Sequence, residues 1–418
     1  MGTRHKFTNG LVVKRLAFAS PYCLIDYSSG AAVAVRDGLE LLARAGFRCE
    51  AFCGARLDFG EEVCLEETLS ELGLPWEGRQ VAVGPHRMKL LFTRQGRVPI
   101  TIFRNQSTRR GPTPQEAPAF LAAFGRFLDT TRPDVMLTYG GDRLTDATIR
   151  QAHRRRIIAV FALHNLAYRD PAPFRNVDYV TVPSEFAKDY YRQQLGLDCR
   201  LVPNVMLPER VKVSDRRPKY LAFVNPQPLK GLFVFARIAE RLARRRSDIP
   251  ILIVESRTRA RALERTGVDL SWAENLFYMP NTPDPRQFYA VTKVLIMPSV
   301  TEESFGLAAA EAMTNGIPVV VSDRGALPET VGEGGIVLDI PARYTVRTTE
   351  VPTGEEVEPW VEAIIRLWDD GAFYRQQSDK SLAWSQRWSP ERLRPLYVDF
   401  LRNVQPQPGP PIVPKLRE

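Results

Sequence analysis

The chain has 418 residues, of which 44% are hydrophobic and 25% are charged, and its net charge is +9. Single hydrophobic cores rarely grow beyond roughly 250 to 300 residues, so this length predicts two domains. No apolar run approaches the roughly 20 residues that a membrane-spanning helix needs, so we expect a globular chain that does not cross a bilayer.

The positive charge favours anionic partners in general, including phosphate-bearing substrates, lipid head groups and nucleic acid, but it does not choose among them. The start of the chain is basic and a short apolar patch follows it. Pro21 and Asp26 interrupt that patch, and no small-residue cleavage site comes after it. We therefore interpret residues 16–22 as the first strand and not as part of a signal peptide.

The five cysteines are odd in number and lack the paired spacing of a zinc site. Buried thiols in a reducing cytoplasm therefore fit better than disulfides or metal ligands. The five are Cys23, Cys49, Cys53, Cys64 and Cys199.

The first half of the chain alternates strand-like and helix-like segments. After the strand at 16–22, apolar residues recur at spacings of three and four over 33–45, and Gly46 is a standard helix stop. Further strands are expected at 49–54, 100–104, 134–140, 157–165, 177–184 and 199–204, and further helices at 117–131, before Arg156, and at 185–196. This alternation predicts an α/β domain with a doubly wound parallel sheet.

A polar segment at 205–219 breaks the periodicity and is interpreted as a linker, after which the alternation restarts. Strands are expected at 220–227, 249–256, 276–280, 294–300, 317–323 and 334–340, and helices from Gly231, at 286–292 and after Ser304. The predicted domains are 1–207 and 218–380. We expect a helix at 381–404 to return to the first domain, and the proline-rich end, 405–418, to be a flexible tail.

The stretch PSVTEESFGLAAAEAMTNGIPVVVSD, which starts at Pro298, predicts the end of a strand, a turn and a helix that Ser304 would cap. Free amides at a helix start bind phosphate readily. Glu303 precedes this helix, and Glu311 lies about two turns deeper on roughly the same side, so the two acids could face opposite ends of one ligand. Taken alone, the residues fit at least as well with Glu303 as a surface acid and Glu311 as a partly solvated helix residue.

The same stretch resembles the Glu-x7-Glu signature of the retaining glycosyltransferases of family 4. The match continues through Ala312, Gly316, Pro318, Val319, Ser322, Gly325 and Pro328 to Glu329. The resemblance implies a GT-B fold, in which two Rossmann-like domains face each other across a cleft and the second binds most of the nucleotide sugar.

The resemblance also implies roles for individual residues. Glu303 would contact hydroxyls of the transferred sugar, and Glu311 would hold the ribose of the nucleotide. His164, in FALHNLAY, would approach the reacting carbon of the donor sugar, although a histidine that is merely satisfied at a strand end remains the alternative. The sugar hydroxyls and phosphate would be held by the turn of Ser304, Phe305, Gly306 and Leu307.

Two parts of the family pattern are altered. The glycine-rich turn after the first strand reads DYSSGAAVAV, which leaves Ser29 and Gly30 as the residues of the expected acceptor and phosphate loop. In AFVNPQPLKG the family's Lys230 and Gly231 are kept, but Asn225 lies where a diphosphate-binding arginine is expected. Either Arg257 replaces that arginine or the helix amides hold the donor, and Arg257 as a plain loop residue is an equal alternative.

The implied reaction is transfer of a sugar, with retention, from a nucleoside diphosphate donor to an unidentified acceptor. No DxD-type motif is present, so neither a metal nor a cofactor is expected. A GT-B epimerase or phosphorylase, or a non-catalytic sugar-nucleotide-binding protein, are the alternatives. Variable loops such as 106–115 would choose the acceptor. We expect a cytoplasmic protein, leave peripheral contact with the anionic inner face of the membrane open, and predict no specific nucleic acid.

Overall fold

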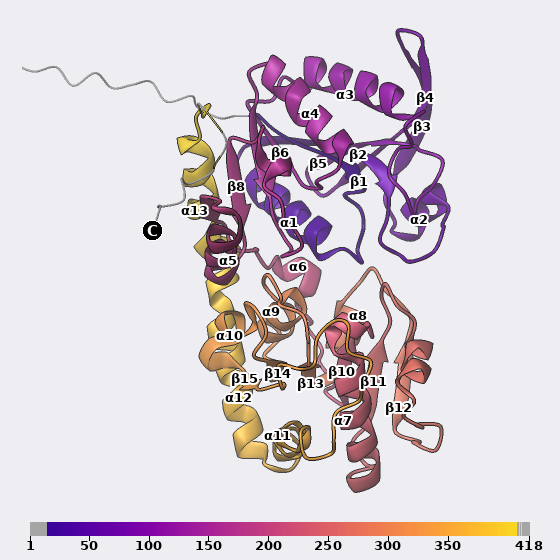
Figure 1. Ribbon diagram of the computed structural model, residues 1–418, viewed down its shortest axis with the longest axis vertical. Coiled ribbons are helices and arrows are strands. Elements are labelled where there is room, and N and C mark those ends of the chain that lie inside the picture. Colours follow the sequence, from indigo (N-terminus) through magenta and orange to yellow (C-terminus); the bar gives the residue numbers. More distant parts are fainter. Residues whose placement is uncertain (1–14, 408, 410, 412–418) are drawn as a thin grey trace, which may run out of the picture.

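The computed structural model describes residues 15–407, 409 and 411, which form two α/β domains stacked one above the other (Figure 1). Within these residues, the sheet of the first domain has nine strands in the order β3-β4-β5-β2-β1-β6-β7-β8-β9. The strands are β1 (Arg15–Tyr22), β2 (Arg48–Arg56), β3 (Trp76–Val83), β4 (His86–Gln95), β5 (Val98–Phe103), β6 (Val135–Thr138), β7 (Ile158–Ala162), β8 (Tyr179–Val182) and β9 (Cys199–Leu201). The helices of this domain are α1 (Gly30–Arg44), α2 (Leu65–Glu71), α3 (Ala117–Thr131), α4 (Arg143–Arg154) and α5 (Glu185–Leu195).

The neighbouring strands β5-β2-β1-β6-β7-β8-β9 are parallel, as the alternating sequence predicts. Strand β4 runs antiparallel to both β3 and β5. The hairpin of β3 and β4 was not predicted. Its outer strand is largely exposed and therefore carries no buried apolar run that would mark it in the sequence. The prediction that all cysteines are buried is wrong at one position, because Cys64 lies exposed just before α2.

The second domain holds a fully parallel sheet in the order β12-β11-β10-β13-β14-β15. Its strands are β10 (Tyr220–Val224), β11 (Ile251–Val254), β12 (Leu276–Met279), β13 (Thr292–Met297), β14 (Val319–Ser322) and β15 (Ile336–Leu338). Its helices are α7 (Leu232–Arg245), α8 (Arg286–Tyr289), α9 (Leu307–Thr314), α10 (Leu327–Val331) and α11 (Glu358–Asp369). This is the strand order of a doubly wound dinucleotide-binding fold, in which ligands bind outside the carboxyl ends of the central strands.

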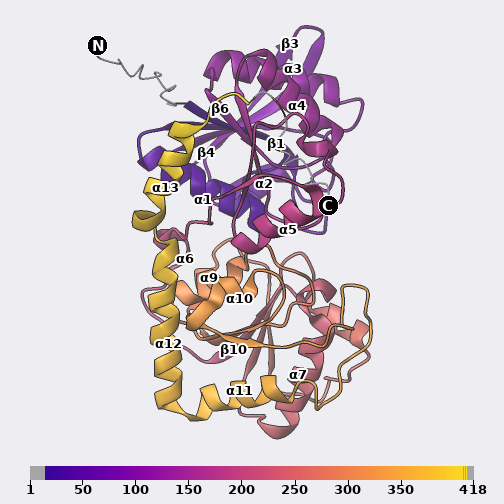
Figure 2. The same ribbon diagram turned by 60° about the vertical axis from the view of Figure 1, so that its left-hand side comes forward.

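Two further segments connect the domains. The linker contains the one-turn helix α6 (Pro208–Val211), and the end of the chain forms α12 (Gly371–Ser385) and α13 (Pro390–Asn403). Figures 1 and 2 show α12 against the second domain and α13 running up the side of the first. There, the Tyr397 hydroxyl donates to the carbonyl oxygen of Pro203 at 2.8 Å. Short 3-10 turns lie at Ala172–Phe174, Pro228–Lys230, Ala260–Thr266, Gly332–Gly334 and Gln386–Trp388.

Among the residues that the structure describes, no helix combines the length and the apolar character that a membrane span requires.

Candidate active site

A cavity of about 760 Å³ lies between the two domains, at the carboxyl ends of the central strands of both sheets. It is the natural place for a ligand in two facing doubly wound folds. Every site residue predicted from the sequence lines it except Gly231. The lining residues among them are Ser29, Gly30, His164, Asn225, Lys230, Arg257, Glu303, Ser304, Phe305, Gly306, Leu307 and Glu311.

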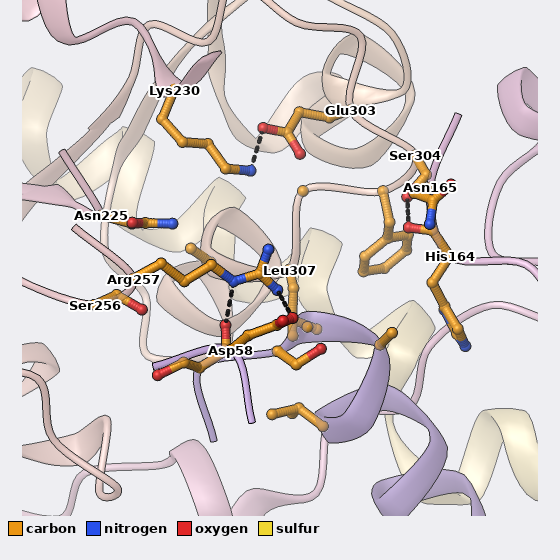
Figure 3. Close-up of a pocket in the computed structure, with 18 of the residues that line it drawn as sticks. Asp58, His164, Asn165, Asn225, Lys230, Ser256, Arg257, Glu303, Ser304 and Leu307 are labelled. Atoms are coloured by element: carbon orange, nitrogen blue, oxygen red, sulfur yellow. Dashed lines mark hydrogen bonds and ion pairs between the residues drawn. The ribbon is translucent and has the colours of Figure 1, made fainter. Parts of the chain in front are cut away.

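Lys230 and Glu303 form an ion pair at the second-domain side of this cleft (Figure 3). The Lys230 Nζ lies 2.6 Å from Glu303 Oε1, and the same oxygen accepts from the Ser299 hydroxyl at 2.8 Å. The side chains of Lys230 and Glu303 are 26% and 12% exposed. Glu303 is therefore a shielded acid held by a cation, and the interpretation as a surface acid is wrong.

Gly231 serves the site through its backbone. Its φ is +85°, and a Cβ at this position would lie 1.7 Å from the carbonyl oxygen of Pro298. Only glycine allows this approach. It lets the Lys230 turn lie against the end of β13, from which Glu303 follows.

The helix α9 begins at Leu307, and Gly306, with a φ of +89°, is its N-cap residue. The predicted Ser304 cap is therefore wrong. The Ser304 hydroxyl instead donates to the His164 carbonyl oxygen at 2.5 Å, and the Ser304 carbonyl oxygen accepts from the Ser184 hydroxyl at 2.7 Å. Ser304 thus joins the two domains, because His164 and Ser184 both follow strands of the first.

The residues at the start of α9 line the cleft. For the amides of Gly306, Leu307 and Ala308, no acceptor occurs among the described residues. A Cβ on Gly30 would lie 3.8 Å from the Leu307 side chain, so the start of α1 approaches the start of α9 across the cleft. The Phe305 side chain is buried, and its ring centroid lies 5.7 Å from that of Trp388. The residue therefore offers a ligand its backbone and not its ring.

Glu311 is buried, so the interpretation as a partly solvated helix residue is also wrong. Its Oε1 lies 2.7 Å from Arg210 Nη1, and its Oε2 accepts from the Tyr289 hydroxyl at 2.9 Å. Arg210 also pairs with Asp37 at 2.6 Å. Sequence reasoning missed Arg210, Tyr289 and Asp37, because an arginine in a linker without periodicity carries no pattern that would assign it to a site.

His164 follows β7 and is neutral at physiological pH, since burial lowers its pKa from 6.5 to about 4. Its Nε2 is buried without a hydrogen-bond partner among the described residues. In Figure 3 the imidazole points away from Lys230 and Glu303. The described contacts therefore do not couple His164 directly to either acid of the motif.

Asn225 occupies the position of the expected arginine at the end of β10 and has a φ of +62°. Its side-chain oxygen is buried without a partner among the described residues. Arg257, the predicted replacement, instead bonds the first domain. Its Nη2 lies 2.9 Å from Asp58 Oδ2, and its Nε donates to the Ser28 carbonyl oxygen at 3.2 Å (Figure 3).

The turn of Ser28 to Gly30 is organised by Asp26. One Asp26 carboxylate oxygen accepts from the backbone amides of Ser28 at 2.8 Å and Ser29 at 3.1 Å, and the other from that of Asp58 at 2.6 Å. Burial raises the pKa of Asp26 to about 6, although these bonds act in the opposite direction. Asp26 therefore fixes both the loop at the start of α1 and the backbone that carries Asp58.

Glu329, the last residue of the matched motif, also connects the domains. Its carboxylate accepts from the backbone amides of Glu185 and Phe186, each at 2.9 Å, at the first turn of α5. A carboxylate at this position satisfies free amides and complements the helix dipole. Because Glu329 lies on α10 of the second domain, this cap fixes the start of α5 to that domain.

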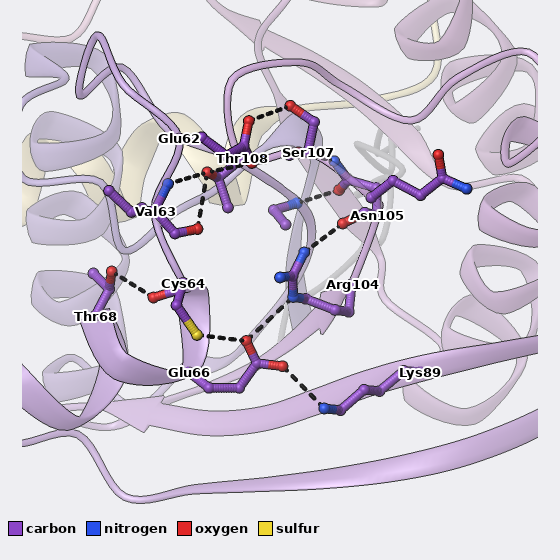
Figure 4. A network of polar contacts seen from close by, with 12 residues as sticks. Glu62, Val63, Cys64, Glu66, Thr68, Lys89, Arg104, Asn105, Ser107 and Thr108 are labelled. Carbon is purple, nitrogen blue, oxygen red and sulfur yellow. Dashed lines mark hydrogen bonds and ion pairs between the residues drawn. The ribbon is translucent and has the colours of Figure 1, made fainter.

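A polar network outside the cleft holds the predicted acceptor loop, 106–115 (Figure 4). Glu62 bonds Thr108 and accepts from the Ser107 hydroxyl at 2.7 Å. Although burial opposes it, bonding to Lys89 and Arg104 lowers the pKa of Glu66 to about 2. The loop that starts at residue 106 is thus tied to the chain around α2.

No group of three or more histidine, cysteine or acidic side chains suited to a metal ion occurs in the described part of the chain.

Comparison with known proteins shows which family the second domain resembles. The family model described as "Glycosyl transferases group 1" matches residues 218–370, which span most of the second domain and include Lys230, Glu303 and Glu311. The second domain is similar to glycosyl transferases group 1 over this range. A D-inositol 3-phosphate glycosyltransferase of Corynebacterium urealyticum is 28% identical over 206 residues, which are 46% of this chain and 45% of that protein. The chain thus spans less than half the length of this inositol phosphate glycosyltransferase.

Solved structures extend the similarity to both domains. Anabaena HepE, in complex with UDP and glucose, covers 94% of this chain and all of its own, with a TM-score of 0.63 and 16% identity. The catalytic domain of Arabidopsis thaliana starch synthase IV, bound to ADP and acarbose, covers 93% of this chain and 99% of its own, with a TM-score of 0.63 and 12% identity. The predicted GT-B fold around the group 1 domain is confirmed.

Proposed function

We propose that this protein is a retaining glycosyltransferase of family 4 that moves a hexosyl group from a nucleoside diphosphate donor to an acceptor held by the first domain. The observation that carries the proposal is the Lys230–Glu303 ion pair beside the start of α9, in a cleft between two facing domains. An ammonium group and free helix amides are the groups that stabilise a departing diphosphate without a metal. The complexes of similar structures with UDP and ADP support a nucleotide donor.

In this proposal each acid has a separate task. Glu303, held by Lys230 and Ser299, faces the sugar and stabilises positive charge that develops on the ring. Glu311, deeper along α9, faces the ribose. The departing phosphate oxygen takes the proton of the acceptor hydroxyl on the same face of the sugar, so that retention needs no enzyme nucleophile. His164 lies on the first-domain wall of the cleft, where it would approach the sugar in its neutral form.

A screen of nucleoside diphosphate sugars by thermal shift, followed by assays of hydrolysis and transfer, tests the proposal. Binding of one donor and release of its sugar with the original anomeric configuration are expected. Product formation without an acceptor would indicate an epimerase, and dependence on orthophosphate would indicate a phosphorylase. A chain that binds no nucleotide sugar contradicts the proposal.

One observation favours a second candidate, a non-catalytic sugar-nucleotide-binding protein. Asn225 replaces the expected arginine, and the candidate substitute, Arg257, bonds Asp58 and Ser28. A bidentate guanidinium contact with phosphate contributes roughly 1.5 to 3 kcal/mol, which this donor site has to supply in another way. Tight donor binding without turnover, with a full panel of acceptors, would identify this second function.

For location, we infer a cytoplasmic protein that contacts the anionic inner face of a membrane peripherally. The net charge of +9 and the exposed Arg109 and Arg110 on the proposed acceptor loop support this inference. Co-sedimentation with vesicles of phosphatidylglycerol, but not of phosphatidylcholine, and loss of binding at high salt are expected. Equal behaviour with both vesicles contradicts it.

A further inference from the structure

Arg210 lies on α6, in the segment that joins the two domains, and its guanidinium bridges acids from both. Its Nε is 2.6 Å from Asp37 Oδ2 on α1, and its Nη1 is 2.7 Å from Glu311 Oε1 on α9. None of the three side chains is more than 16% exposed. Charge-assisted bonds in such a shielded place fix the orientation of the guanidinium.

The remaining nitrogen of this guanidinium, Nη2, is buried and has no acceptor among the residues that the structure describes. Every nitrogen of a guanidinium is a donor, so exchanging the two terminal nitrogens would still leave an unused donor at this position. Arg210 and Glu311 both line the cleft. A buried donor without an acceptor is costly, so the arrangement points to an acceptor that a bound ligand supplies.

The Glu311 carboxylate is only half used by the protein. Oε1 accepts from Arg210 and Oε2 accepts from the Tyr289 hydroxyl. Each carboxylate oxygen can accept two bonds, so one position remains on each. Nη2 shares its carbon with Nη1, which already bonds Glu311, so an unused donor lies close to unused acceptors. A hydroxyl group donates one hydrogen bond and accepts another, and therefore matches this pair.

This inference rests on the proposed donor site and deepens it. We propose that Arg210 determines donor specificity by donating from Nη2 to a ribose hydroxyl whose proton Glu311 accepts. A site built to bond a hydroxyl rejects the analogue that lacks it, because its buried groups are then left unpaired. The protein therefore selects ribonucleoside diphosphates over the corresponding deoxyribonucleotides.

Calorimetry with UDP, GDP, ADP, their 2′-deoxy and 3′-deoxy forms, and dTDP tests this assignment. The wild-type protein should bind one ribonucleoside diphosphate at least about tenfold more tightly than a deoxy form of it. Arg210→Lys keeps a cation between the two acids but loses the second terminal nitrogen, so the ratio should fall to about threefold or less.

The matched control is Arg216→Lys. Arg216 is another arginine of the linker, and its two terminal nitrogens donate to the carbonyl oxygens of Asn315 at 2.7 Å and Thr292 at 2.8 Å. It does not line the cleft, so its variant should keep the wild-type ratio. If Arg210→Lys does not fold, the double variant Arg210→Gln with Asp37→Asn replaces it, because the two changes together keep the net charge. Circular dichroism verifies the fold of whichever variant is used.

An unchanged ratio in the folded Arg210 variant overturns the inference and leaves the donor site standing. A wild-type protein that binds the deoxy forms or dTDP as tightly as the ribonucleotides overturns it in the same way. A wild-type protein that binds none of these diphosphates overturns both the inference and the proposed function.

Discussion

The Lys230 ammonium lies 2.6 Å from the Glu303 carboxylate, although 73 positions separate the two residues in the chain. The strands that precede them, β10 and β13, are parallel neighbours in the sheet, so the turns at their carboxyl ends meet. The pair places a cation beside the start of α9, where free amides already favour an anion. In the proposed function, Lys230 would bind a diphosphate while it holds the Glu303 carboxylate in place.

Lys230→Ala should weaken the binding of a nucleoside diphosphate by about 10- to 100-fold, since charge-assisted bonds contribute roughly 1.5 to 3 kcal/mol. Affinity for the nucleoside without phosphate should hardly change. Calorimetry with both ligands measures the difference. Lys219→Ala, which removes an exposed lysine outside the cleft, is the control.

A Lys230→Ala protein that binds the diphosphate as tightly as wild type would show that the donor site is not in the second domain. Asn225→Arg in the Lys230→Ala background provides a further check. Asn225 lines the same cleft at the end of β10, so a new guanidinium there should restore part of the diphosphate affinity.

The two acids of the motif should differ in the kinetic constant they affect. Glu311→Ala should mainly weaken binding of the free nucleoside diphosphate, because Glu311 is assigned to the ribose. Glu303→Ala should mainly lower kcat, because Glu303 is assigned to the reacting sugar. Calorimetry and steady-state kinetics on both variants separate the assignments, and equal diphosphate affinity of wild type and Glu311→Ala refutes the first.

Much of the fold could be predicted because buried strands and amphipathic helices leave local patterns. The apolar runs that became β10, β13 and β14 and the spacing in α1 are readable one segment at a time. The order of the parallel strands then follows from general rules of α/β folds. Those rules also bring the turns of Lys230 and Glu303 to one edge.

The missed features depend on how the domains meet, which no local pattern records. Arg210 reaches Asp37 and Glu311 from a linker that has no helix or strand periodicity, and Glu329 caps a helix of the other domain. Ser304 has the residue type of a helix cap, but its hydroxyl bonds the His164 carbonyl of the first domain instead. In each case a contact between distant segments overrides the local expectation.

Asp26 and His164 should give the stability of the protein two opposing pH dependences. The folded pKa of Asp26, about 6, lies above its ordinary value of 3.8, so its contribution is present below about pH 4 and is lost as pH rises through 6. This shift corresponds to about 3 kcal/mol. The folded pKa of His164, about 4, lies below 6.5, so its contribution is present above 6.5 and is lost as pH falls through 4.

Urea unfolding between pH 4 and 7 separates these two effects. In Asp26→Asn the histidine remains, so the free energy of unfolding should rise with pH across this window relative to wild type. In His164→Gln the acid remains, so the free energy of unfolding should fall with pH relative to wild type. Profiles parallel to that of wild type in both variants would contradict the environments assigned to the two groups.

The Glu329 cap of α5 should contribute measurably to stability. Glu329→Ala leaves the amides of Glu185 and Phe186 without their acceptor, and losing such a cap costs about 1 kcal/mol. Chemical denaturation measures this loss. Glu333→Ala, an exposed acid of the same region with no described bond to the first domain, is the control and should leave the free energy of unfolding nearly unchanged.

Arg257 is the residue whose role the structure changes most. The sequence suggests a substitute for the missing diphosphate arginine, but its guanidinium bonds Asp58 and the backbone of Ser28. Asn281 donates to the Ser28 hydroxyl at 2.8 Å, so the second domain holds the same turn at a second point. We therefore expect Arg257 to act by positioning the turn before α1 against the start of α9.

A double-mutant cycle of Arg257→Ala and Asp58→Asn tests this role. If Arg257 acts through Asp58, each single variant should lower kcat/KM to a similar extent and the double variant should lose little more. If Arg257 instead contacts the diphosphate, Arg257→Ala alone should weaken diphosphate binding and Asp58→Asn should not. The neighbouring pair Arg259 and Glu61 also joins the domains, at 2.6 Å, but with both side chains more than half exposed. Its cycle should show almost no coupling, because exposed ion pairs contribute little.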